Sequence, residues 1–172
     1  MRNDKNDPKC GGGKHEPWWP RDVINYINAI LQPTFDCFEW GSGRSSKWLA
    51  DRVKSLITID NNQEWTDSIP DMPNIEKHCL NLKSGYAEAI VTHSKKDRKY
   101  DFIFVDGRNR VACIKAAKPF LKEGGFLMLD NSDRKRYNGA WEELKLWPFA
   151  DFHIFCDFER RYWGNTIWRN YV

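Results

Sequence analysis

Apolar residues along the chain follow two different spacings. Between Val23 and Leu31 they recur every three or four positions, which predicts an amphipathic helix, and Pro33 lies just past its end. Further along, Phe102–Val105 and Phe126–Leu129 are apolar without interruption. Short continuous runs of this kind are typical of strands that are covered on both faces.

Strand-like runs alternate with helical segments through the middle of the chain. The expected strands are Phe35–Glu39, Ser55–Asp60, Ile75–Leu82, Asp101–Asp106 and Gly125–Asp130. The expected helices between them are Ser45–Lys54, Gln63–Ser68, Tyr86–Ser94 and Asn109–Lys118. This alternation predicts an α/β fold with a doubly wound, mostly parallel sheet and helices on both faces.

The pattern changes after Asp130. A helix is expected near Ala140–Leu146, and two apolar runs follow at 151–158 and 162–172, joined by the charged turn Glu159–Arg161. Runs joined so closely predict an antiparallel C-terminal hairpin, which brings the expected sheet to seven strands. We therefore expect a flexible N-terminal tail over residues 1–16 and a single domain over residues 17–172.

Composition narrows the class of protein. The 172 residues suit one domain, and 27 Lys+Arg against 24 Asp+Glu give no overall field that would attract nucleic acid or a membrane. We find no apolar run near the roughly 20 residues that span a bilayer and no apolar signal region at the N-terminus. Five widely spaced cysteines indicate reduced thiols, so a cytoplasmic location is expected. His78 and His153 lie in expected strands, where we expect structural roles.

The most informative stretch is the turn Phe-Glu-Trp-Gly-Ser-Gly-Arg-Ser-Ser at residues 38–46. Gly41 and Gly43 allow a sharp turn and close approach of a ligand, while Ser42 or a later serine can cap the next helix. The third glycine of a dinucleotide-binding turn is missing. Glu39 in front of the turn would repel a pyrophosphate but suits a cation.

Asp60 ends the next expected strand, where an acidic side chain can accept hydrogen bonds from both hydroxyls of a ribose. A cationic amino-acid head, a ribose and no phosphate together describe S-adenosylmethionine. The chain resembles the class I S-adenosylmethionine-dependent methyltransferases, and it is similar in pattern to the metal-dependent catechol O-methyltransferase type. The motifs of the resemblance lie at residues 38–46, 57–62, 100–110 and 121–131, and it runs from Trp18 to the C-terminus.

The resemblance implies a set of cofactor-binding residues, which are Glu39, Gly41, Ser42, Gly43, Asp60, Ser84, Gly85, Tyr86 and Asp106. Glu39 and the two glycines would face the methionine portion, Asp60 the ribose, and the stretch around Gly85 the adenine. Asp106 would lie near the methyl group. Trp40 departs from the family's usual small residue, so it must point away from the cofactor or the turn must be unusual.

Asp106, Asp130 and Asn131 form a second group at the ends of two expected strands. Such oxygen ligands suit Mg²⁺ or Ca²⁺, and the resemblance implies a Mg²⁺ site with Asp106 and Asp130 as catalytic residues. The lysine base of that type is missing, so Asp106 or Asp130 would accept the proton if metal is absent. Alternatively, Asp106 caps the next helix and Asp130 closes a turn with Asn131.

Basic and aromatic residues near these strand ends have two interpretations each. Arg108 and Arg110 would hold an anionic substrate group or the loop itself, because a guanidinium is a poor base. Arg134 belongs to a basic loop. This loop would face the substrate, or it would be a solvated surface. Trp18 and Trp19 would form a lid over the site, or pack the first helix on the sheet.

The expected function is transfer of a methyl group from S-adenosylmethionine to an oxygen of a small hydroxylated molecule, such as a sugar or a metabolite. The basic loops leave open an RNA or protein methyltransferase, although no added recognition domain favours nucleic acid. A non-catalytic binding module with this fold is the third alternative. The partners expected are a small-molecule acceptor and no membrane, and a homo-oligomer is left open.

Overall fold

The computed structural model describes residue 13 and residues 15–94, 97–156 and 161–171. Most of the expected tail, Cys10 and most of the expected turn Glu159–Arg161 therefore lie outside the described residues. At the described end of the tail, both carboxylate oxygens of Glu16 accept hydrogen bonds from the Arg21 guanidinium at 2.7 Å.

Seven strands form one mixed sheet in the order β3-β2-β1-β4-β5-β7-β6. The strands are β1 Asp36–Trp40, β2 Ser55–Asp60, β3 Ile75–Cys79, β4 Tyr100–Val105, β5 Leu121–Asp130, β6 Phe149–Cys156 and β7 Arg161–Arg169. The first five strands are parallel to one another, whereas β7 pairs antiparallel with both β5 and β6. The predicted fold class is confirmed, including the antiparallel C-terminal hairpin.

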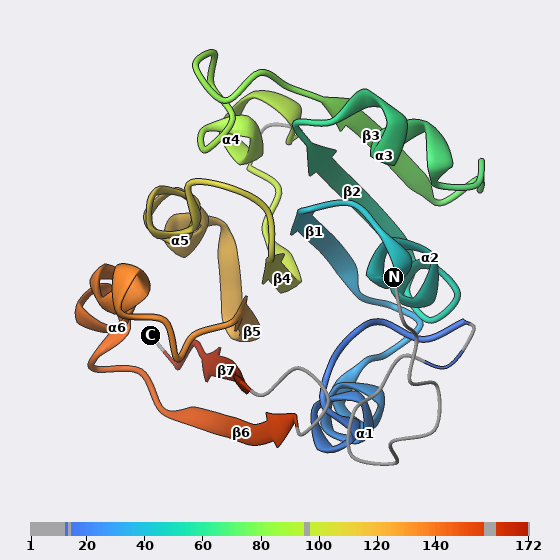
Figure 1. The fold of residues 1–172 in the computed structure, drawn as a ribbon. Helices are drawn as coiled ribbons and strands as arrows, with labels where there is room; N and C mark the ends of the chain where they lie inside the picture. The colour runs from blue at the N-terminus through green and yellow to red at the C-terminus, as the bar shows by residue number, and fades with distance from the viewer. Residues whose placement is uncertain (1–12, 14, 95–96, 157–160, 172) are drawn as a thin grey trace.

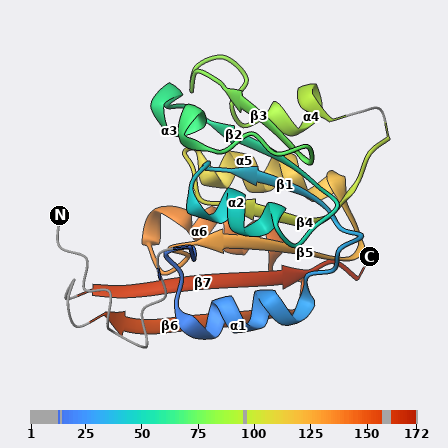
Figure 2. The same cartoon turned by 90° about the vertical axis from the view of Figure 1, so that its right-hand side faces the viewer.

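Helices cover both faces of this sheet (Figure 1). They are α1 Arg21–Ile30, α2 Arg44–Ala50, α3 Gln63–Ser68, α4 Ala89–His93, α5 Arg110–Ala117 and α6 Asn138–Leu144. Short 3₁₀ turns occupy Lys118–Phe120 and Lys135–Tyr137. Figure 2 shows α1 alongside β6, where the rings of Tyr26 and Phe152 lie 5.3 Å apart. In the described part of the chain, no helix is long and apolar enough to cross a membrane.

The apolar run Phe102–Val105 of β4 is buried on both faces of the sheet. Phe102 and Phe104 are buried in the cluster that includes α1 and α2, while Ile103 and Val105 are buried in the cluster that includes α5. Because neighbouring residues of a strand point to opposite faces, a strand between two helical layers must be apolar at every position.

Several element boundaries differ from those predicted. The strand β3 ends at Cys79 rather than Leu82, and α4 begins at Ala89 rather than Tyr86. The intervening loop includes Gly85 with a φ of +76°, a left-handed conformation that neither helix nor strand continues. This longer loop lies at the carboxyl end of β3, beside the predicted adenine site.

Candidate functional site

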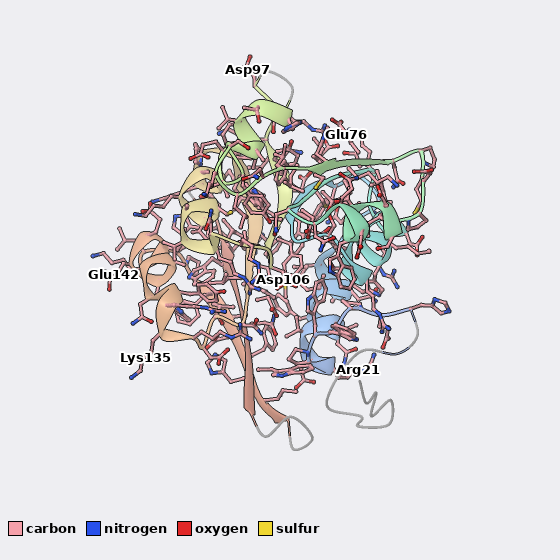
Figure 3. All side chains as sticks on the ribbon, turned by 45° about the horizontal axis from the view of Figure 1, so that its top comes forward. Arg21, Glu76, Asp97, Asp106, Lys135 and Glu142 are labelled. Carbon is pink, nitrogen blue, oxygen red and sulfur yellow. The ribbon has the colours of Figure 1, made fainter. Side chains whose placement is uncertain are left out.

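Four acidic residues meet at one edge of the sheet. The strands β2, β1, β4 and β5 are neighbours, and Asp60, Glu39, Asp106 and Asp130 lie at or next to their carboxyl ends. Asp106 lies near the centre of the molecule in Figure 3. Since ligands of open α/β sheets bind beyond these strand ends, the predicted site residues are gathered where a ligand is expected.

Glu39 is completely buried beneath the glycine turn. Its carboxylate accepts hydrogen bonds from the hydroxyls of Ser45, Ser46 and Thr58. The Ser42 hydroxyl extends this network because it lies 2.8 Å from the Thr58 hydroxyl, whose own proton is donated to Glu39. Glu39 therefore organises the turn and the first residues of α2, and its predicted contact with the cofactor stays a prediction.

Burial raises the pKa of Glu39 from 4.5 to about 7, against the three hydroxyls, which lower it. The serine-rich sequence after the turn thus offsets part of the cost of placing a carboxylate in the core. Thr58 was not predicted as a site residue from the sequence. A polar residue in an otherwise apolar strand is a signal that could have identified it.

The two glycines of the turn have different surroundings. Gly41 has a φ of +102°, and a Cβ there would lie 2.6 Å from the Gly107 main-chain nitrogen. It therefore allows the β1 and β4 loops to pack backbone against backbone. Gly43 is extended, and a Cβ there would meet nothing within 4 Å. Gly43, with open space beside it, is the glycine of this turn at which a ligand can approach the main chain.

Trp40 points away from the glycine turn and into the core. It is fully buried against Phe38, and its indole nitrogen donates to the Tyr86 carbonyl at 2.8 Å. The first of the two alternatives for this bulky residue is therefore confirmed. Tyr86 is itself buried, and its hydroxyl accepts from the Arg108 main-chain nitrogen at 3.3 Å. Tyr86 thus contacts both the end of β1, through Trp40, and the loop after β4, through Arg108.

Asp60 and the loop after β3 lie beside this turn. Asp60 is 9% exposed, and its Oδ1 accepts from the main-chain nitrogens of Asn61 and Asn62 at 2.7 and 2.8 Å. Both bonds use the same oxygen, which leaves Oδ2 as the oxygen to which a ligand hydroxyl can donate. Ser84 and Gly85 are exposed at the surface of the loop.

The Arg110 guanidinium lies among the three predicted metal ligands. Its Nη2 donates to Asp106 Oδ1 at 2.6 Å, and its Nη1 lies 3.4 Å from both Asp130 Oδ2 and Asn131 Oδ1. Nη1 also donates to the Asp130 carbonyl, and Nε donates to the Gly107 carbonyl at 3.0 Å. A fixed cation already satisfies these oxygens, so the donor set as arranged does not fit a divalent ion.

Asp106 and Asp130 are in different environments. Burial and the nearby negative charge of Asp130 raise the pKa of Asp106 well above its ordinary value, although Arg110 lowers it in part. The Asp106 side chain remains 37% exposed, whereas that of Asp130 is 12% exposed. Asp130 Oδ1 also accepts from the Asn165 amide on β7 at 2.8 Å. Asp106 is thus the accessible carboxylate of the pair, and Asp130 is the anchored one.

The remaining predicted residues fall around the same edge. Arg108 is exposed on the loop after β4, and Arg134 is half-buried on the loop after β5. The two tryptophans, Trp18 and Trp19, lie in different environments. Trp19 is buried with its ring 4.9 Å from that of Phe104, while Trp18 is 58% exposed and lies 5.0 Å from the guanidinium of Arg44.

Arg44 is the first residue of α2 and directly follows Gly43. The exposed tryptophan therefore lies next to the turn, as a lid would, while its neighbour packs the core. A separate hollow of about 450 Å³ lies at the opposite end of the sheet, beside Ile30, Glu123 and Arg169, and contains none of the predicted site residues.

Solved structures of low sequence identity share this architecture. The O-methyltransferase of Bacillus cereus in complex with SAH is 17% identical, with a TM-score of 0.68 over 91% of this chain and 83% of that one. Precorrin 8w decarboxylase of Methanobacterium thermoautotrophicum is 18% identical, with a TM-score of 0.65 over 95% of each chain. An rRNA methylase of Streptococcus thermophilus is 11% identical, with a TM-score of 0.63 over 87% of this chain and 95% of that one.

The chain has the class I methyltransferase fold. No protein-family model and no curated protein matches its sequence. At these identities the likeness establishes the fold, and the named proteins act on different kinds of substrate. The activity must therefore be argued from the residues at the strand ends.

Proposed function

We propose that the protein is an S-adenosylmethionine-dependent methyltransferase that methylates an oxygen of a small hydroxylated molecule, such as a sugar or a metabolite. The observation that carries the proposal is the row of strand-end acids, in which an oxygen of Asp60 is available beside an open glycine turn. The fold supports the same conclusion, since solved structures of this fold hold SAH or SAM.

The cofactor side is formed by β1, β2 and the loop after β3. Asp60 would accept hydrogen bonds from the ribose hydroxyls through Oδ2, and the space beside Gly43 would take the methionine portion. The exposed Ser84 and Gly85 would border the adenine. Trp18, held over Arg44, would cover the methionine end and exclude water.

The acceptor side is formed by the ends of β4 and β5. When bound, S-adenosylmethionine would supply a methyl group on a positively charged sulfur, and breaking of the methyl–sulfur bond would leave neutral S-adenosylhomocysteine. Asp106 would orient the acceptor hydroxyl for in-line attack and take its proton as the new carbon–oxygen bond forms. Arg108 and Arg134 would contact an anionic group on the acceptor.

The arginine contacts favour a reaction that needs no divalent metal. Arg110 stabilises Asp106 and Asp130 where the resemblance implies Mg²⁺, and it holds the β4 loop through the Gly107 carbonyl. Asp130 is the positioning residue of this pair, since it is anchored from β7 by Asn165. The alternative that Arg110 holds its own loop is thus the one that its contacts support.

The experiment is a methyl-transfer assay with labelled S-adenosylmethionine and a panel of diols, phenols and sugars, with Mg²⁺ or with EDTA. We expect transfer to a hydroxylated small molecule at equal rates in both conditions. Asp106→Asn should lower kcat by about a hundredfold or more with little change in cofactor affinity. Activity that requires Mg²⁺ would contradict the role given to Arg110. Transfer to RNA or to protein alone would contradict the proposed acceptor.

A further inference from the structure

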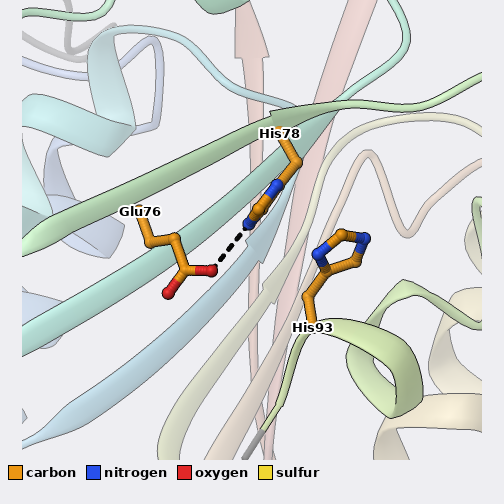
Figure 4. Close-up of side chains that lie close together, drawn as sticks. All are labelled: Glu76, His78 and His93. Atoms are coloured by element: carbon orange, nitrogen blue, oxygen red, sulfur yellow. Dashed lines mark hydrogen bonds and ion pairs between the residues drawn. The ribbon is translucent and has the colours of Figure 1, made fainter.

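The side chains of two histidines and a glutamate from β3 and α4 lie close together (Figure 4). Glu76 and His78 lie two residues apart on β3, so both side chains point to the same face of the sheet. His93 is the last residue of α4 and faces them. The potential ligand atoms of the three side chains all lie within 4.8 Å of one another.

The contacts within this cluster are those of groups that can share an ion. His78 Nε2 lies 2.8 Å from Glu76 Oε1, and the two imidazole rings have centroids 4.0 Å apart. Burial and the neighbouring His78 lower the pKa of His93.

We propose that Glu76, His78 and His93 form a binding site for Zn²⁺. Imidazole nitrogen and carboxylate oxygen suit Zn²⁺ rather than Mg²⁺ or Ca²⁺, and three protein ligands leave a fourth position for water. A tetrahedral ion with bonds of about 2.1 Å places its ligands about 3.4 Å apart, so the three side chains would adjust from their present spacing, in which the ligand atoms lie within 4.8 Å of one another. Glu76 is 56% exposed and can move freely.

The ion would connect two elements that the sequence holds apart. Residues 80–88 join the end of β3 to the start of α4, and the proposed ion would link β3 to the end of that helix. It would thereby restrain the loop that carries Ser84 and Gly85. This consequence for cofactor binding rests on the proposed function, whereas the metal site itself does not.

The metal is tested with the full chain, stripped with EDTA and titrated with Zn²⁺ by calorimetry in the presence of a phosphine reductant. We expect one ion per chain. His78→Ala and His93→Ala should each weaken binding by at least about tenfold. Co²⁺ in place of Zn²⁺ should give visible bands without thiolate charge transfer, because the ligands are nitrogen and oxygen. At 100 times the dissociation constant, Zn²⁺ should raise Tm by roughly 5 to 10 °C.

The chain offers a matched control. His153 on β6 also lies beside a carboxylate two residues away, with its Nε2 3.2 Å from Asp151 Oδ1. His153→Ala should therefore leave Zn²⁺ binding unchanged. Glu76→Gln, at an exposed position, should keep the fold and still weaken binding. The site would be overturned if the intact chain did not bind Zn²⁺. It would also be overturned if His78→Ala and His93→Ala bound Zn²⁺ as tightly as the intact chain.

The same titration distinguishes this site from the proposed function. Zn²⁺ binding and the rise in Tm are measured without any cofactor, so they stand even if S-adenosylhomocysteine does not bind. If both ligands bind, Zn²⁺ should tighten S-adenosylhomocysteine in the intact chain and have no such effect in His93→Ala. An unchanged cofactor affinity would overturn the coupling through residues 80–88 while leaving the metal site intact.

Discussion

Replacing Glu39 by glutamine should change how the stability of the protein depends on pH. The folded chain holds the carboxyl with a pKa of about 7, whereas the unfolded chain holds it at its ordinary value of 4.5. The folded state therefore binds a proton more tightly than the unfolded state between these values. Stability must then fall as the pH rises from about 4.5 through 7, and it should level off above that.

The size of this effect follows from the two pKa values. Between pH 5 and pH 8, a group with these pKa values lowers the free energy of unfolding by about 2 to 3 kcal/mol. Glu39→Gln cannot lose a proton in this range, so its contribution is constant. The difference in stability between the intact chain and Glu39→Gln should thus shift by about 2 to 3 kcal/mol toward the variant as the pH rises.

The assay is urea unfolding of both proteins at closely spaced pH values from 5 to 8.5, with tryptophan fluorescence as the probe. Comparison with the variant removes the effect of titrating groups that do not interact with Glu39, because these are present in both chains. A difference that changes by less than about 1 kcal/mol across this range would refute the burial argument for Glu39. A difference that moves in favour of the intact chain would refute its sign.

Three further predictions concern the strand ends. Gly107→Ala should destabilise the protein by about 1 to 3 kcal/mol in urea unfolding, because a Cβ there would lie 2.0 Å from a buried tyrosine hydroxyl. Gly43→Ala should leave stability within about 0.5 kcal/mol and instead weaken S-adenosylhomocysteine in calorimetry, since its Cβ would enter open space. Arg110→Met should cost about 3 kcal/mol or more by leaving two carboxylates without their cation, whereas Arg108→Met at an exposed position should be neutral in the same unfolding assay. Equal losses of stability in Gly107→Ala and Gly43→Ala, or in Arg110→Met and Arg108→Met, would contradict the roles given to these residues.

The fold could be predicted from the sequence because each level of the pattern agreed with the next. Residues Phe102–Val105 of β4 are apolar at every position, as expected of a strand between two helical layers. The helix α4 was predicted too long because Tyr86 is apolar and continues its periodicity, yet this residue is buried beneath the β1 and β4 loops. Burial by distant elements carries no local signal.

The candidate site was only partly predictable for the same reason. The strand-end acids could be read from the sequence because parallel strands bring their carboxyl ends to one edge. The position of the Arg110 guanidinium among them could not, since it depends on the direction of α5 after the left-handed Asn109. The pairing of His78 with His93 was also missed, because their approach depends on how α4 packs beside β3.

The central claim is that the open edge beside Gly43 and Asp60 binds S-adenosylmethionine. The most direct measurement is calorimetry of S-adenosylhomocysteine with the intact chain, Asp60→Asn and the surface control Asp67→Asn. Asp60→Asn keeps an oxygen for the two main-chain bonds but loses the second carboxylate oxygen that would accept from a ribose hydroxyl. The account predicts micromolar binding that weakens at least about tenfold in Asp60→Asn and is unchanged in Asp67→Asn. Equal binding in all three chains, or none in the intact chain, would contradict it.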